Sequence, residues 1–261
     1  MMRSLYIATT GMAAQQLSIE VISNNLANVS TTGFKKSAAE FHELLYQTFR
    51  PAGSPRTSGV LPVGIQVGLG VQPMSVHKTF RQGDFEQTLN DFDIAIEGDG
   101  FFQVTLPDGN TGFTRSGNFK LNNEGAVVTS EGLPLLPAIS IPSGMQKISI
   151  SPEGVVSGVA AGTTTETVIG TMELARFANP AGLDSLGKNL YQVTTASGEA
   201  LTGVPGKEGF GKLEQGFLES SNVNIAEEMV KMITAQRAYE LNSKAIQTSD
   251  EMLSLVNNLK R

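Results

Sequence analysis

The stretch LANVSTTGFKKS, from Leu26 to Ser37, separates two kinds of sequence and thereby decides how the chain is organised. Before it, apolar residues recur every seven positions, the spacing of a helix that packs along one stripe. This first row consists of Leu5, Met12, Ile19 and Leu26. The segment Thr31–Gly33 then interrupts the pattern, and Gly33 supplies the backbone freedom of a sharp turn. The sequence predicts a long first helix that ends here.

The first helix carries a second apolar row on another face. It lies two positions further on, about 200° around the helix, and consists of Ile7, Ala14 and Val21. One partner helix cannot cover both faces. Charged residues are also sparse, with Arg3 and Glu20 the only ones before Lys35. These features favour contacts with other subunits, although a core helix of a globular fold stays an alternative.

The C-terminal end repeats this design. Apolar residues again recur every seven positions, at Ile225, Met232, Tyr239, Ile246 and Leu253. Asn224 stands where a helix N-cap belongs, and Glu227 follows in capping-box spacing. The pattern predicts a helix from about Ile225 to Leu259, which is longer than most globular helices and needs a partner. Because the chain leaves the first helix and must return to the last, the simplest pairing is antiparallel.

The middle of the chain has a different composition and residue pattern. Ser37 and Glu40 have capping-box spacing, so a short helix is expected before Arg50. The segment Arg50–Val71 is rich in Pro, Gly and Ser and is expected to be extended or looped. After it, short β runs alternate with turn signals, as in FDIAIEG, FFQVTL followed by PDGN, and KISI followed by SPEG. We therefore expect an antiparallel β domain inserted between the two helical ends.

The expected fold class is α+β, with long N- and C-terminal helices pairing as a coiled coil and an inserted Gly-rich antiparallel β domain. Three parts are expected. Residues 1–35 and 217–261 form a discontinuous terminal-helix domain, residues 36–70 form a short helix and a connecting arm, and residues 71–216 form a β-rich outer domain.

Composition narrows the classes of function. The chain has 261 residues, of which 40% are hydrophobic, enough for a sizeable core. A formal net charge of −6 argues against a nucleic-acid binder, because phosphate contacts need a clustered basic face. The absence of cysteine excludes disulfides and thiolate sites. We recognise no cleavable secretion signal and no stretch apolar enough to span a membrane.

The sequence offers no convincing active site, and we expect no enzyme, cofactor, metal or small-molecule substrate. His42 and His77 lack carboxylates at metal-ligand spacing. The acidic residues between Asp91 and Asp99 alternate with apolar ones, as solvent-facing strand residues do. Neither a phosphate-binding glycine loop nor a G-x-S-x-G nucleophile motif is found.

Three stretches together resemble the bacterial flagellar rod and hook family. They are ISNNLANVSTTGFKKS (22–37), IEGDGFFQVTLPDGNTGFTRSGNFKLNNEGAVVTSEG (96–132) and GFLESSNVNIAEEMVKMITAQRAYELNSKAIQTSDEML (216–253). The chain length and the segment SPRTSGVLPVGIQVGLGV (54–71) point to the distal-rod branch. A proximal rod or hook subunit of the same family is an alternative. From another class, the alternative is a secreted β-rich binding module or hydrolase with helical oligomerisation arms.

The resemblance implies a structural subunit that leaves the cell through the flagellar type III export apparatus, without a cleaved Sec signal, and polymerises helically in the periplasm-spanning rod. It implies that the terminal helices form an inner tube and that the partners are further copies, proximal rod proteins, hook protein and the P and L rings. The first row would face the C-terminal helix through Met232, Tyr239, Ile246 and Leu253. Hydrogen bonds near the bend would come from Asn24, Asn25 and Asn28.

A connecting arm between subunits is expected from Tyr46 to Val71. Prolines restrict this segment, glycines redirect it, and arginines offer forked donors. The arm residues are Arg50, Pro55, Arg56 and Leu61. The alternative is an unattached loop.

Overall fold

The computed structural model describes residues 2–53, 55–56, 59–60, 62–160, 162 and 165–258. Its chain divides into two compact units. The helix unit comprises Met1–Leu26, Ser37–His77 and Asn224–Arg261, and the β unit comprises Ala27–Lys36 and Lys78–Val223. The α+β class expected from the sequence is thereby confirmed, whereas the three-part domain division stays a prediction.

The helix unit contains the two predicted terminal helices, α1 (Met2–Ala27) and α2 (Ile225–Asn258). The N-cap predicted for α2 is confirmed, because the Asn224 Oδ1 atom accepts a hydrogen bond of 3.2 Å from the Glu227 N–H. The Glu227 carboxylate lies 2.6 Å from the Lys231 ammonium one turn later. The expected end of α2 at Leu259 lies outside the described residues.

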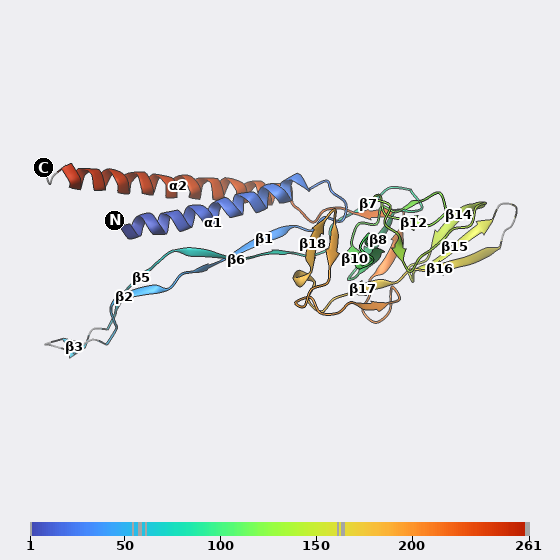
Figure 1. Ribbon diagram of the computed structural model, residues 1–261, viewed down its shortest axis with the longest axis horizontal. Coiled ribbons are helices and arrows are strands. Elements are labelled where there is room, and N and C mark those ends of the chain that lie inside the picture. Colours follow the sequence, from blue (N-terminus) through green and yellow to red (C-terminus); the bar gives the residue numbers. More distant parts are fainter. Residues whose placement is uncertain are drawn as a thin grey trace. The chain divides into compact units, whose positions relative to one another are not determined.

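A two-stranded ribbon completes the helix unit (Figure 1). Strand β1 (Ser37–Glu43) pairs with β6 (Val71–Lys78), and β2 (Tyr46–Arg50) pairs antiparallel with β5 (Ile65–Gly68). Strands β3 (Pro55–Arg56) and β4 (Gly59–Val60) form a further short pair. The described residues between Arg50 and Val71 lie in short strands and turns, in agreement with the expected extended or looped segment.

The short helix expected after Ser37 is wrong, because this segment forms β1 and β2. The capping-box spacing is a local signal, and it is overridden by the ladder partners that β6 and β5 provide. Ser37 is held by Asn25 instead: its N–H donates 2.8 Å to the Asn25 Oδ1 atom, and its carbonyl accepts 2.8 Å from the Asn25 amide nitrogen.

The β unit is built around a seven-stranded sheet with strand order β18-β19-β10-β9-β17-β20, in which β13 also pairs with β9. These strands are β18 (Asp184–Gly187), β19 (Leu190–Gln192), β10 (Thr111–Thr114), β9 (Phe101–Thr105), β17 (Leu174–Arg176), β20 (Leu201–Gly203) and β13 (Leu135–Leu136). The described pairings in this sheet are antiparallel, as the alternation of short β runs and turn signals predicted.

Smaller sheets surround this one. Strands β14 (Met145–Ile150), β15 (Val155–Ala160) and β16 (Glu166–Thr171) form a three-stranded antiparallel sheet. The remaining pairs are β11 (Lys120–Leu121) with β12 (Val127–Val128), β8 (Ile94–Glu97) with β21 (Lys212–Gln215), and β7 (Phe85–Gln87) with β22 (Phe217–Glu219). A 3₁₀ turn, η1, spans Pro180–Gly182.

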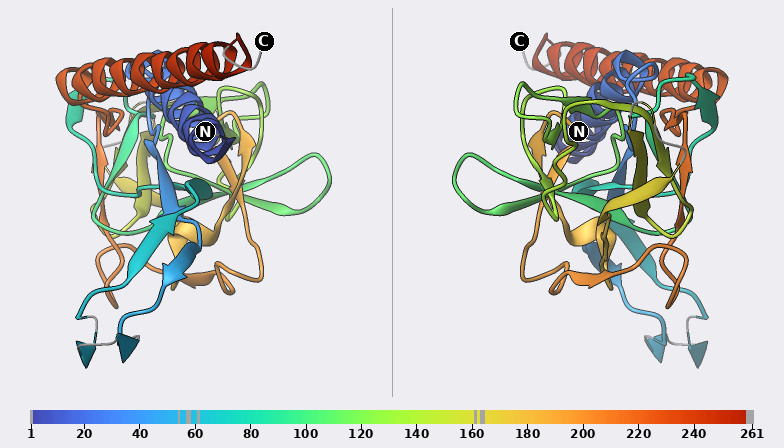
Figure 2. Two further views of the ribbon diagram at one scale, coloured as in Figure 1. Left: turned by 90° about the vertical axis from the view of Figure 1, so that its left-hand side faces the viewer. Right: turned by 90° about the vertical axis from the view of Figure 1, so that its right-hand side faces the viewer.

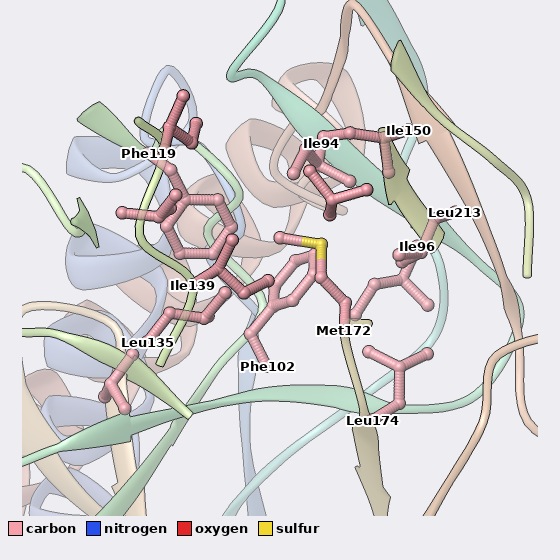
Figure 3. Packing of buried hydrophobic residues seen from close by; sticks show 14 of the residues in the cluster. Ile94, Ile96, Phe102, Phe119, Leu135, Ile139, Ile150, Met172, Leu174 and Leu213 are labelled. Carbon is pink, nitrogen blue, oxygen red and sulfur yellow. The ribbon is translucent and has the colours of Figure 1, made fainter. Parts of the chain in front are cut away.

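Strand β9 lies between two hydrophobic clusters. Successive side chains of a strand point to opposite faces, so Phe102 and Val104 enter one cluster while Phe101 enters the other. Figure 3 shows the larger cluster, in which Phe102 and Met172 lie among aliphatic side chains from several strands. The smaller cluster is aromatic and includes Tyr191, which packs edge to face on Phe101. These clusters give the β unit a core of its own.

Candidate assembly interface

The helices α1 and α2 run side by side in opposite directions (Figures 1 and 2). The Ser4 and Ser249 hydroxyl oxygens are 3.4 Å apart near one end. At the other end the Asn25 Nδ2 atom donates 3.0 Å to the Glu228 Oε2 atom. Between these contacts a Cβ atom added to Gly11 would lie 2.9 Å from the Asn242 Nδ2 atom. The antiparallel direction predicted from the chain path is thus present within one subunit.

These three contacts join small or polar residues. Counted along α1, Ser4, Gly11 and Asn25 occupy positions of one heptad row, and Glu228, Asn242 and Ser249 occupy one on α2. We call these two rows the polar seam. Gly11 permits the close approach because it has no side chain. The sequence predicted hydrogen bonds at Asn25 but not the seam, because seven-residue spacing was followed among apolar residues only.

Asn25 is the most enclosed member of the polar seam, with 1% of its surface exposed. Its amide nitrogen donates to Glu228 and to the Ser37 carbonyl, and its amide oxygen accepts the Ser37 N–H. Glu228 is 2% exposed, and its second carboxylate oxygen accepts 3.0 Å from the Lys231 ammonium. The hydrogen bonds to Glu227 and Glu228 raise the pKa of Lys231. The hydrogen bonds of Asn25 and Glu228 therefore join α1, α2 and β1, the first strand of the ribbon.

The predicted apolar rows flank the polar seam. All members of the first row are half-buried, as are Met232, Ile246 and Leu253, whereas Ile225 and Tyr239 are exposed. That the first row faces the C-terminal row stays a prediction. Of the other asparagines predicted near the bend, Asn24 is exposed, and the Asn28 side chain accepts a hydrogen bond of 3.3 Å from the Thr31 hydroxyl.

The helix unit exposes much apolar surface. On α2 the exposed residues include Met229, Val230, Ile233, Leu241 and Leu255, and on the ribbon Leu45, Phe49, Val63, Ile65 and Met74. Scattered apolar residues are normal on a soluble protein, but a two-stranded ribbon is marginally stable alone and its exposed edges invite pairing. Such surface marks an interaction face.

The expected arm is the far part of the ribbon. Arg50 ends β2, exposed and in register with Ile65, and Pro55 and Arg56 form β3. Leu61 lies outside the described residues. The ribbon also touches α1, since the Arg3 guanidinium carbon lies 4.6 Å from the Phe49 ring centroid and the Val71 N–H donates 3.4 Å to the Thr10 hydroxyl.

Gly33, which the sequence places at the bend, lies in the β unit. Its φ is +69°, and a Cβ atom there would come within 2.7 Å of the Ser116 backbone nitrogen. Only glycine fits this position without displacement of the backbone.

Within the described ranges, no three His, Cys, Asp or Glu side chains are grouped to hold a metal ion. Nor does any helix among those residues have the length and apolarity that crossing a membrane requires.

Known proteins resemble the chain along its full length. A flagellar basal-body rod protein FlgG of Borreliella burgdorferi is 52% identical to it, and the match covers 100% of both chains. The chain belongs to this flagellar rod family. The FlgG proteins of Buchnera aphidicola subsp. Acyrthosiphon pisum and of Bacillus subtilis are 50% and 41% identical, over 99% and 100% of this chain and 100% of their own.

Family models match the same three regions that carry the resemblance. The flagella basal body rod protein model matches residues 5–35, the flagellar hook protein FlgE/F/G D1 domain model residues 95–158, and the flagellar basal body rod FlgEFG C-terminal model residues 214–259. The resemblance inferred from the sequence is confirmed, and so is the function of a structural rod subunit.

Proposed function

We propose that this rod subunit polymerises helically into the distal part of the flagellar rod, a rigid hollow shaft that carries torque from motor to hook and encloses the export channel. This proposal rests on the sequence identities of 52% and 50% to two FlgG proteins, over 100% and 99% of this chain. The exposed apolar surface of the helix unit agrees with it, because a polymer would remove that surface from water.

In the polymer we assign the apolar rows to coiled-coil packing that forms the inner tube. The polar seam holds α1 against α2 within a subunit, and the flanking rows, whose members are half-buried or exposed in the single chain, keep apolar area for neighbouring copies. On this assignment the first row and its C-terminal counterpart form the self-assembly interface. The ribbon, with Arg50 and Arg56, reaches an adjacent subunit.

The partners we propose are further copies, the proximal rod proteins, the hook protein and the surrounding P and L rings. The chain would reach the periplasm-spanning rod through the flagellar export apparatus, without a cleaved Sec signal. These assignments rest on membership of the rod family.

Electron microscopy of the purified chain at rising concentration tests the proposal. We expect straight tubes of uniform width with a central channel. A chain that stays monomeric at high concentration, yet binds or hydrolyses a glycan saturably, would favour the alternative of a β-rich binding module or hydrolase.

A further inference from the structure

A buried ion cluster lies inside the β unit, outside the proposed assembly interface. The Lys35 side chain is fully buried, and its ammonium lies 2.5 Å from the Glu219 Oε1 atom. The same ammonium donates 2.8 Å to the Arg81 carbonyl, and the Gly83 N–H donates 2.9 Å to Glu219 Oε1. Burial lowers the pKa of Lys35, while the Glu219 carboxylate opposes this shift.

A second cation approaches the same carboxylate. Arg115 is 3% exposed, and its Nη1 atom lies 3.7 Å from the Glu219 Oε2 atom. Its Nη2 atom donates 2.7 Å to the Gly98 carbonyl. The Arg115 Nε and Glu219 Oε2 atoms have no hydrogen-bond partner, so the charges are incompletely compensated. Replacing a buried ion cluster by well-packed apolar residues is often neutral or stabilising, so stability alone does not account for these buried charges.

Backbone segments from three parts of the chain are tied together at this cluster. The Gly33 N–H donates 2.7 Å to the Glu219 carbonyl, and the Thr79 N–H donates 2.9 Å to the Lys36 carbonyl. The Asn222 side chain closes the arrangement, because it accepts 2.8 Å from the Lys36 N–H and donates 2.8 Å to the Thr79 carbonyl. Segments 27–36, 78–83 and 217–223 therefore hold one another within the β unit.

These three segments are where the chain passes between its two units. The unit boundaries fall after Leu26, Lys36, His77 and Val223. Each boundary borders one of the three tied segments. The segments that enter and leave the β unit could have been held at separate places. Here the segments at all four boundaries take part in the same group of buried contacts.

We propose that Lys35, Arg115 and Glu219 form a junction clamp, which ties together the segments that enter and leave the β unit. A force arriving along α1 or α2 then reaches the β unit through this clamp rather than through separate strands. The clamp opens as one group, independently of the core around β9. This property belongs to the single chain and does not depend on polymerisation.

Amide hydrogen exchange on the full-length monomer tests the clamp. In Lys35→Met, which leaves the Glu219 carboxylate buried without its main partner, the Gly33, Lys36 and Thr79 amides should exchange on the order of 100-fold faster. The β9 and β10 amides should change by less than about threefold. The matched control is Lys188→Met, which removes the exposed ion pair of Lys188 with Glu131 and should leave both groups of amides unchanged.

If exchange of the clamp and core amides accelerates equally in Lys35→Met, the cluster is an ordinary part of the core. If no amide exchanges faster, the cluster does not hold the three segments together. Either result would overturn the proposal. If Lys35→Met does not fold, the wild-type protein provides the test. Exchange measured in rising sub-denaturing urea should then give the three clamp amides one common opening, distinct from that of β9. Three unrelated openings, or an opening shared with β9, would contradict the proposal.

A mechanical measurement gives a second readout. Single molecules held by their two ends are loaded through the connecting segments, so the clamp should be the first contact of the β unit to open. Under constant force the lifetime of this step should be at least about tenfold shorter in Lys35→Met than in Lys188→Met. Equal lifetimes in these two variants would overturn the clamp.

Discussion

Single side chains decide how the two helices meet. Asn25 uses both amide N–H groups and its amide oxygen in three hydrogen bonds, to Glu228 and to both backbone groups of Ser37. An apolar residue would pack as tightly but would leave Glu228 and the Ser37 N–H without these partners. The polar seam thus specifies one pairing of the helices, whereas a purely apolar stripe tolerates several.

Asn25→Ala tests this specification. We expect α1 and α2 to separate at that end, with a loss of stability of the helix unit of about 2 kcal/mol, because a buried carboxylate and a backbone N–H lose their partner. Urea titration followed by helical circular dichroism measures it. Ser23→Ala, on the exposed face of the same helix turn, is the control and should change little. Equal stability of the two variants would contradict the role of Asn25.

Ile246 tests the apolar row. It is half-buried in the single chain, and its replacement by Asp would place an unpaired charge in each proposed subunit contact, at a cost of several kcal/mol. Tubes should not form, while the near-ultraviolet circular dichroism of the β unit stays unchanged. The neighbouring exposed variant Gln247→Asp should assemble. Normal tubes from Ile246→Asp would show that this row is not an interface.

Tyr191 predicts how stability depends on alkaline pH. Burial raises the pKa of this phenol well above its usual value of about 10. Because the folded pKa exceeds the unfolded one, the contribution is complete below about pH 10 and is lost as the pH rises towards the folded pKa. Between pH 9 and 11 the wild type should lose about 1 kcal/mol more than Tyr191→Phe.

Urea denaturation at several pH values measures this difference. The lowered pKa of Lys35 acts in the opposite direction, since the unfolded chain then binds more protons, but it is present in both proteins and cancels in the comparison. Parallel pH profiles of wild type and Tyr191→Phe would contradict the prediction.

At the scale of elements, the ribbon shows where local pattern and long-range pairing compete. The residues after Ser37 have helix-capping spacing, yet they form strands because β6 and β5 pair with them. A capping box contributes about 1 kcal/mol, whereas a strand ladder satisfies every second backbone group. Partners that are distant in the sequence therefore decide this element.

The ribbon should stiffen the polymer by bracing adjacent subunits. Deleting Ala52 to Val60 should leave tubes that form but curve more readily, and their persistence length can be measured in electron micrographs. Arg56→Ala should weaken the brace only modestly, because a single surface ion pair contributes little. A replacement of the same nine residues by a Gly-Ser linker controls for length. Deletion tubes as straight as wild type would place the stiffness elsewhere.

On the scale of the whole molecule, the chain combines a self-sufficient unit with a dependent one. The β unit has two hydrophobic clusters of its own, while the helix unit leaves many large apolar residues exposed. Burial of apolar area is the main source of folding stability, so the two units should differ in stability before assembly.

Limited proteolysis of dilute monomer measures this difference. Cleavage should begin in the ribbon and near the end of α2, and the β unit, Ala27–Lys36 together with Lys78–Val223, should persist. In the polymer the same sites should be protected. Ends that resist protease equally in monomer and polymer would show that the helix unit needs no neighbours.

The sequence specified the terminal helices, the N-cap at Asn224, the β texture of the middle and the flagellar family, since these depend on local spacing and on motifs that are read in order. It did not reveal the polar seam, the strands after Ser37 or the cluster of Lys35, Arg115 and Glu219. Each of these depends on residues that are far apart in the chain and meet only after folding. The cost of burying a lysine, or the value of a small polar row, depends on the partner that the tertiary structure places opposite, and heptad spacing alone does not identify that partner.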